Sequence, residues 1–139
     1  MKMKRVTKSE LIIYDSGCIM GADNLFERIK RINIDYSQEN FLVFYMNTKH
    51  KILHTEILFK GGLNSSIVDL RTLFRNTLLQ NAHKIVVAHN HPSGNLTPSE
   101  EDLDVYKNMK EAGKIIQIEV LDFVIFNRTE FFSCGREYE

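Results

Sequence analysis

The stretch from His89 to Asp102 contains the side chains best suited to bind a metal ion. His89 and His91 are two positions apart and follow the run 84–88, which predicts a buried strand. Side chains two positions apart on a strand point to the same face, so both imidazoles are expected to face one ion. Asp102 can supply a third ligand. Two neutral nitrogens and one carboxylate leave a tetrahedral zinc ion with an open fourth position, which is typical of catalytic zinc sites.

A helix is expected to present Asp102 to the histidines. Thr97 is a suitable N-cap, Pro98 suits the first helical position, and Glu100 would complete a capping box. Ser99 and Asp102 are then three positions apart near the helix start, so they share a face. The Ser99 hydroxyl could donate to the oxyanion of a tetrahedral intermediate. The alternative is that Ser99 is an ordinary early residue of the helix.

A zinc-dependent hydrolase also needs a general base, and Glu56 is the candidate in this sequence. Zinc lowers the pKa of a bound water to about 7, but a base must still pass a proton to the leaving group. Glu56 interrupts the apolar run 52–59, where a carboxylate is costly without a purpose. The alternative is that Glu56 lies on the solvated face of an edge strand.

Each candidate metal ligand also has a simpler explanation. Acidic side chains are common in the first turn of a helix because they interact favourably with its dipole. On that basis other residues compete with Asp102: Glu100, Glu101 and Asp104. The two histidines could be hydrogen-bonded residues at a strand end, but the turn 92–94 favours a metal site because it lets the chain double back. Three other histidines lack such neighbours and are expected to be surface or structural residues: His50, His54 and His83.

The elements that must position these residues alternate between strands and helices. Besides 84–88, four runs predict strands: 41–46, 52–59, 115–121 and 123–126. Two amphipathic runs predict helices at 22–32 and 67–78, and Gly113 suits the end of the helix that carries Asp102. The pattern predicts an α/β (mixed α+β) fold with a central mixed β-sheet and helices on both faces. The histidines are expected at the carboxyl end of a central strand.

Length and composition indicate an ordinary globular protein of 139 residues, most simply one domain. The formal net charge is +0, so nothing global attracts nucleic acid. The basic side chains within 22–32 are expected to form a solvated face, with nucleic-acid contact as the alternative. We find no signal peptide and no apolar run long enough to cross a membrane, so a cytoplasmic location is expected. Cys18 and Cys134 are far apart in the sequence and are expected to be free thiols.

Together these residues resemble the metalloprotease motif of the JAB (MPN+, JAMM) superfamily. That motif is a distal glutamate followed by His-x-His, seven residues, Ser, two residues and Asp. The longer string from His89 to Asp102 resembles the RadC branch, as does the run 61–66, which begins five residues after Glu56. The resemblance covers residues 38–139. It leaves residues 1–37 as a short N-terminal extension packed on or leading into the core, without the helix-hairpin-helix region of longer RadC proteins.

The resemblance implies a JAB fold, one zinc ion per chain, and a peptide or protein substrate, since the superfamily hydrolyses peptide or isopeptide bonds. It implies three roles: metal ligands at His89, His91 and Asp102, a general base at Glu56, and an oxyanion donor at Ser99. The RadC branch has a name from DNA repair, but the missing N-terminal region weakens a role on DNA. Phe123 departs from the family, which often has His at that position.

Two other functions are alternatives to a peptidase: a metal-dependent nuclease linked to repair, and a non-catalytic binding scaffold. HNH nucleases spread their residues over a ββα unit with a histidine on its helix, and the helix after Pro98 contains no histidine. A scaffold is expected where the metal ligands have been lost, and here all are present. A zinc deaminase would need a Pro-Cys-x-x-Cys motif, which is missing. The sequence leaves the oligomeric state open, a homodimer included.

Overall fold

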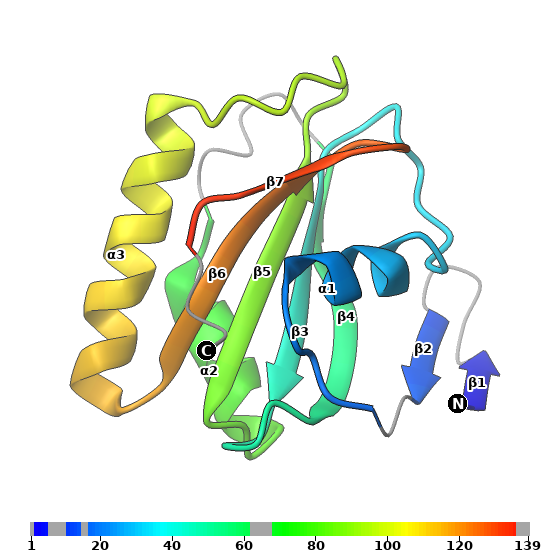
Figure 1. Ribbon diagram of the computed structural model, residues 1–139. Helices are drawn as coiled ribbons and strands as arrows, with labels where there is room; N and C mark the ends of the chain where they lie inside the picture. Colours follow the sequence, from blue (N-terminus) through cyan, green and yellow to red (C-terminus); the bar gives the residue numbers. More distant parts are fainter. Residues whose placement is uncertain (1, 6–10, 15–16, 62–67, 136–139) are drawn as a thin grey trace.

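A five-stranded mixed sheet forms the centre of the protein (Figure 1), with strand order β4-β3-β5-β6-β7. The computed structural model describes residues 2–5, 11–14, 17–61 and 68–135. The five strands are β3 (Asn40–Met46), β4 (Ile52–Lys60), β5 (Lys84–Asn90), β6 (Glu119–Phe126) and β7 (Phe131–Ser133). β5 and β6 are parallel, whereas the other neighbouring pairs are antiparallel. Two short strands, β1 (Lys2–Arg5) and β2 (Leu11–Tyr14), form a separate antiparallel pair.

Helices cover both faces of the central sheet, as the sequence predicted. Helix α1 (Ala22–Ile29) packs on one face, against a cluster that includes Leu42 and Phe44. Helices α2 (Leu70–Leu79) and α3 (Glu100–Ile116) pack on the other face (Figure 1). Because strand side chains alternate, consecutive residues of β3 enter the two clusters in turn. The fold is therefore a mixed α/β architecture.

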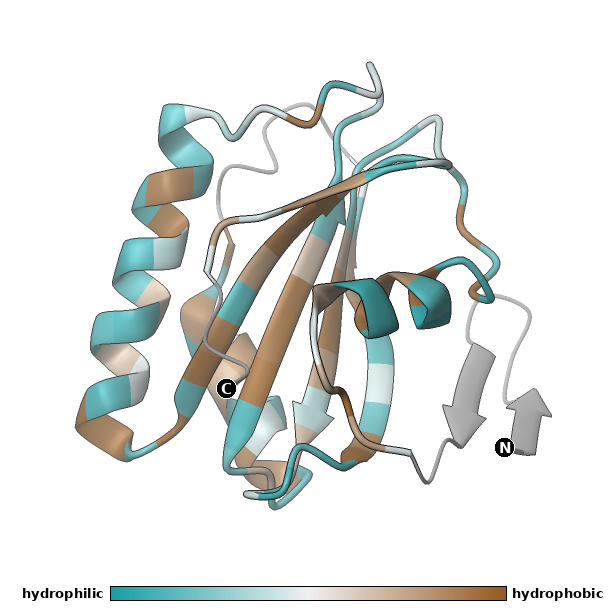
Figure 2. Ribbon diagram, in the orientation of Figure 1, coloured by the Kyte–Doolittle hydropathy of each residue, from teal (hydrophilic) through white to brown (hydrophobic). Residues whose placement is uncertain are grey.

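The central strands β3 and β5 are apolar almost throughout because both of their faces are covered. Every residue of β3 is buried, and so are the last six residues of β5. Figure 2 shows this pattern, with apolar colour along the strands and mostly polar colour on the outer surface of α3. A continuous apolar run is expected for a strand buried on both faces. The histidines thus lie at the end of a strand that is buried on both faces.

The predicted boundary after α3 is wrong. The run 115–121 was expected to be a strand, but α3 continues to Ile116 and β6 is one continuous strand from Glu119. Gln117 ends the helix in a left-handed conformation with φ 62°. Gly113 does not end α3. A Cβ atom there would lie 2.3 Å from the carbonyl oxygen of Ile118, so glycine lets the chain leaving the helix pass close to it.

Helix α2 begins at Leu70, where the side chain of Asp69 accepts hydrogen bonds from two backbone N–H groups. Residue 67, where this helix was expected to begin, and most of the run 61–66 lie outside the described residues. The two cysteines are free, as predicted. Within the described ranges, no helix combines the length and hydrophobicity needed to cross a membrane. The division of the chain at residues 37 and 38 stays a prediction.

Candidate metal centre

The structure brings the three predicted ligands together. His89 lies near the carboxyl end of β5, His91 is the first residue beyond it, and Asp102 lies in the first turn of α3. Asp102 Oδ1 is 2.9 Å from His89 Nε2, and Asp102 Oδ2 is 3.0 Å from His91 Nε2. One ligand atom from each residue lies within 4.8 Å of the others. The three side chains therefore face one point in space.

The loop after β5 orients the imidazole of His91. His91 Nδ1 lies 2.7 Å from the carbonyl oxygen of Asn95, which can only accept a hydrogen bond. Nδ1 must therefore carry a proton, and in the neutral ring Nε2 has a free lone pair that faces the Asp102 carboxylate. Two lone pairs at 3.0 Å repel each other unless a proton or a cation lies between them. The arrangement suits a cation.

His89 supports the same conclusion from a more buried position. The residue is 7% exposed, and its Nε2 atom has no hydrogen-bond partner of good geometry among the described residues. A buried unpaired nitrogen is costly unless a ligand satisfies it. In a tetrahedral zinc site with bonds near 2.1 Å, neighbouring ligand atoms are about 3.4 Å apart. The distances of 2.9 and 3.0 Å need only a small outward movement to match, so the residues fit such an ion.

Charge at the centre is balanced between the carboxylate and the imidazoles. Burial tends to raise the pKa of Asp102, but the nearby imidazoles of His89 and His91 and the hydrogen bond from the Ser99 backbone together hold that pKa well below its usual range. The hydrogen bond with Asp102 raises the pKa of His91, although burial opposes this. Without a metal, the site therefore favours an ionised Asp102 and binds a proton on His91 more tightly than a free imidazole does. Binding of a divalent cation would displace that proton.

Ser99, not Thr97, is the N-cap of α3, so the predicted cap is wrong. Ser99 Oγ accepts a hydrogen bond from the backbone N–H of Asp102 at 3.0 Å, and the backbone N–H of Ser99 donates to Asp102 Oδ2 at 2.8 Å. This reciprocal capping box holds the ligand carboxylate in place. Glu100 does not complete the box because it is the first residue of the helix. The Ser99 hydroxyl proton is not used by the cap, and its role as an oxyanion donor stays a prediction.

Glu56 lies on the same face of the sheet as His89 but has other partners. Its Oε1 accepts hydrogen bonds from the Tyr45 hydroxyl at 2.5 Å and from Asn76 Nδ2 at 3.2 Å. Glu56 pairs with Val43, which in turn pairs with Val87, two residues before His89. Strand geometry then separates Glu56 from His89 by about 10 Å across the sheet and about 7 Å along it. Its role as general base stays a prediction.

Glu39 is an acidic residue at the centre that sequence reasoning missed. Its Oε1 lies 3.7 Å from His89 Nδ1, and its side chain is 22% exposed. The neighbouring Asn40 helps to hold the Glu39 backbone near His89, because the backbone N–H of Asn40 donates to Asn90 Oδ1 at 2.8 Å. In the sequence Glu39 is only a lone acid before an apolar run. The antiparallel pairing of Phe41 with His89 brings it to the histidines, and no local sequence pattern signals that pairing.

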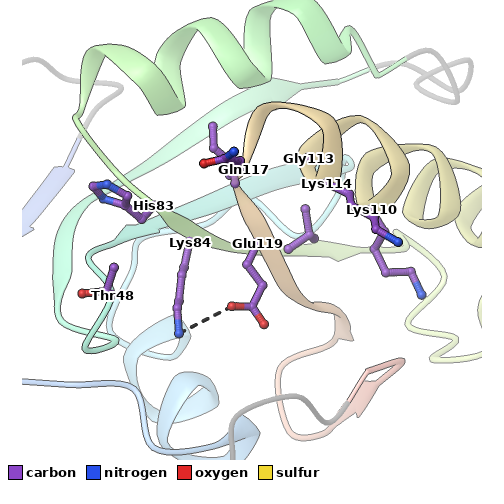
Figure 3. Close-up of a pocket in the computed structure, with 10 residues that line it drawn as sticks. Thr48, His83, Lys84, Lys110, Gly113, Lys114, Gln117 and Glu119 are labelled. Carbon is purple, nitrogen blue, oxygen red and sulfur yellow. Dashed lines mark ion pairs between the residues drawn. The ribbon is translucent and has the colours of Figure 1, made fainter.

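The other histidines lie elsewhere, as predicted. His50 Nε2 is 3.0 Å from Lys84 Nζ, His54 stacks on the ring of Tyr45, and His83 is exposed. His83 also lines a pocket of about 470 Å³ at the amino end of β5 and β6 (Figure 3), where Lys84 and Glu119 form an ion pair at 3.5 Å. The rise along β5 puts this pocket about 17 Å from the metal centre. The two sites are separate.

Comparison with known proteins agrees with the motif. Residues 19–138 match the family described as RadC-like JAB domain. The UPF0758 protein of Chlorobium chlorochromatii is 38% identical over 115 residues, which are 83% of this chain and 52% of that protein. The UPF0758 protein of Geobacillus kaustophilus is 40% identical over 129 residues, 87% of this chain and 56% of that one. The chain thus spans about half the length of these curated relatives, whose names state no activity. The chain belongs to the RadC-like JAB domain family.

Proposed function

We propose that this chain is a zinc-dependent hydrolase that cleaves a peptide or isopeptide bond. The observation that carries the proposal is the convergence of two imidazole nitrogens and one carboxylate oxygen within 4.8 Å of one another. This donor set favours one zinc ion per chain with a fourth position left open. When bound, zinc would supply a water molecule acidified to a pKa of about 7.

The residues around the ligands provide the remaining parts of such a site. A general base must be within hydrogen-bond reach of the proton that it removes, directly or through one water. Glu39 meets this condition best, because its carboxylate is beside His89 and partly open to solvent. We therefore propose that Glu39 accepts the proton from the attacking water and returns it to the leaving amine. Glu56 is the alternative base, and Ser99 is the proposed donor to the oxyanion.

Metal analysis combined with a cleavage screen tests the proposal. The zinc-loaded chain is incubated with libraries of peptides and of isopeptide-linked peptides, and zinc content is measured on the same sample. We expect one zinc ion per chain and metal-dependent cleavage. His91→Ala should lose both properties. His83→Ala is the matched control, since His83 is an exposed histidine outside the ligand group, and it should keep both.

Two outcomes would contradict the proposal in different ways. If His91→Ala bound zinc as tightly as the parent chain, the metal centre would be wrong. If the parent bound one equivalent of zinc but cleaved no amide bond in either library, the centre would stand and the hydrolase assignment would fail. Cleavage of plasmid DNA that depends on His91 would instead support a nuclease.

A further inference from the structure

The sheet places three ring side chains in one row at the level of His89. Phe41 on β3 pairs with His89 on β5 and with Phe59 on β4. Residues paired directly across neighbouring strands point to the same face, so the three rings share one surface. The ring centroids of Phe41 and His89 are 6.5 Å apart, and those of Phe41 and Phe59 are 5.7 Å apart. An aromatic wall therefore runs from the metal centre to β4.

This wall is accessible at its β4 end. Phe41 is 5% exposed and belongs to the core, whereas Phe59 is only partly buried against that core. β4 is an edge strand of the five-stranded sheet, so Phe59 has no neighbouring strand of that sheet on its outer side. On the opposite side of His89 the row continues with Ile125, which is fully buried. Among the described residues, the apolar surface next to the centre is thus less deeply buried on the β4 side than on the β6 side.

The spacing suits a peptide held at the metal centre. Two strand spacings place Phe59 about 10 Å from His89, and an extended peptide advances about 3.3 Å per residue. One or two residues cover about 3.3–6.6 Å of that distance and the length of the substrate side chain covers the rest, so a side chain at either position could reach the Phe59 ring. We propose that Phe59, backed by Phe41, forms an apolar subsite that selects peptide substrates with an apolar side chain one or two residues from the cleaved bond. This inference rests on the proposed hydrolase function and narrows its substrate.

The test compares peptides that differ only at one position within two residues of the cleaved bond, leucine against serine. For the zinc-loaded parent chain we expect kcat/KM to be at least about tenfold higher for leucine at one of these positions. Phe59→Ala should bring this ratio close to one, mainly through loss of activity on the leucine peptide, with unchanged zinc content. Phe59→Leu should retain the preference. Phe132→Ala removes an exposed ring from the opposite edge strand and should behave like the parent.

The possible failures are distinguishable. A parent chain that cleaves both peptides equally would overturn the subsite and leave the hydrolase proposal standing, and so would a Phe59→Ala variant with the parent ratio. A parent chain that cleaves only isopeptide-linked peptides would overturn the subsite alone, and one that cleaves neither kind of substrate would overturn both proposals. If Phe59→Ala does not fold, Phe59→Thr replaces it, because a β-branched residue suits a strand and still removes the ring. Circular dichroism and zinc content, measured on each variant, verify that the fold and the centre are intact.

Discussion

Two carboxylates on the same side of the molecule, Glu39 and Glu56, lie in very different surroundings. Glu39 is next to the imidazole of His89 and partly open to solvent. Glu56 lies between β3, β4 and α2, where a phenol and an amide donate to the same oxygen. Both residues are acids next to buried apolar strands, and only their neighbours separate them. The comparison shows that the role of an acidic residue depends on which groups the fold brings to it.

The surroundings of Glu56 are those of a structural anchor. Tyr45 is fully buried, and burial, together with the hydrogen bond to Glu56 and its charge, holds the pKa of the phenol well above its ordinary value. Asn76 comes from α2, so Glu56 connects that helix to the β3–β4 hairpin. A carboxylate with two donors is compensated at a partly buried position. At the metal centre, by contrast, the groups are arranged to receive a cation.

The largest expected difference between the two acids is in catalysis. Glu39→Gln should keep zinc and lower kcat/KM by about 100- to 10,000-fold, which is the usual contribution of a general base. Glu56→Gln should change kcat/KM by no more than a few-fold, since its amide oxygen can still accept from Tyr45. Peptide cleavage and zinc content are measured on both variants. The reverse result would restore Glu56 as the base and leave Glu39 as a neighbour of the metal.

The second difference concerns stability. Glu56→Ala leaves the buried Tyr45 hydroxyl without its acceptor, so we expect the free energy of unfolding to fall by about 1–3 kcal/mol. Glu39→Ala removes a partly exposed side chain and should cost about 0.5 kcal/mol or less in the metal-free chain. Urea unfolding of the two variants measures both values. Equal losses would mean that the two acids have similar structural roles.

Ser99, at the start of α3, is a further residue next to the metal centre whose structural role can be measured. Ser99→Ala removes the side-chain cap of α3, and we expect it to lower the free energy of unfolding by about 1 kcal/mol. Ser99→Thr retains the hydroxyl and should be close to the parent. Thermal unfolding of the metal-free variants provides the measurement. A loss of the same size in Thr97→Ala would be inconsistent with Ser99 as the N-cap.

The smallest effect is on the ionisation of Tyr45. Because its pKa is raised in the folded chain, the folded state holds the phenol proton more tightly than the unfolded state. This contribution is present below the ordinary tyrosine pKa of about 10 and is lost as the pH rises above it. Glu56→Gln should lower the pKa of Tyr45 because it removes the negative charge, while burial still keeps it above the ordinary value. Tyrosinate absorbance during an alkaline titration, with Tyr45→Phe as the reference, measures the change.

Local sequence patterns predicted the strands and helices well, and they failed at particular junctions. The continuous apolar runs of β3 and β5 were readable because burial on two faces demands apolar residues throughout. The N-cap of α3 could not be predicted in this way, because both Thr97 and Ser99 are good N-caps with an acidic residue three positions later. The structure shows that Ser99 is the cap. The end of α3 was missed because Gly113 serves close packing against Ile118 instead of a helix stop.

The grouping of His89, His91 and Asp102 can be predicted from the sequence, because they belong to one strand, turn and helix start, whose local geometry brings them together. The surroundings of that group depend on how distant segments pack. Glu39 comes 50 positions before His89, and it arrives there through strand pairing, which sequence spacing does not encode. Phe59 joins the aromatic row for the same reason. Strand pairing depends on contacts between distant segments, so the neighbours of the metal centre follow from the fold and not from the motif.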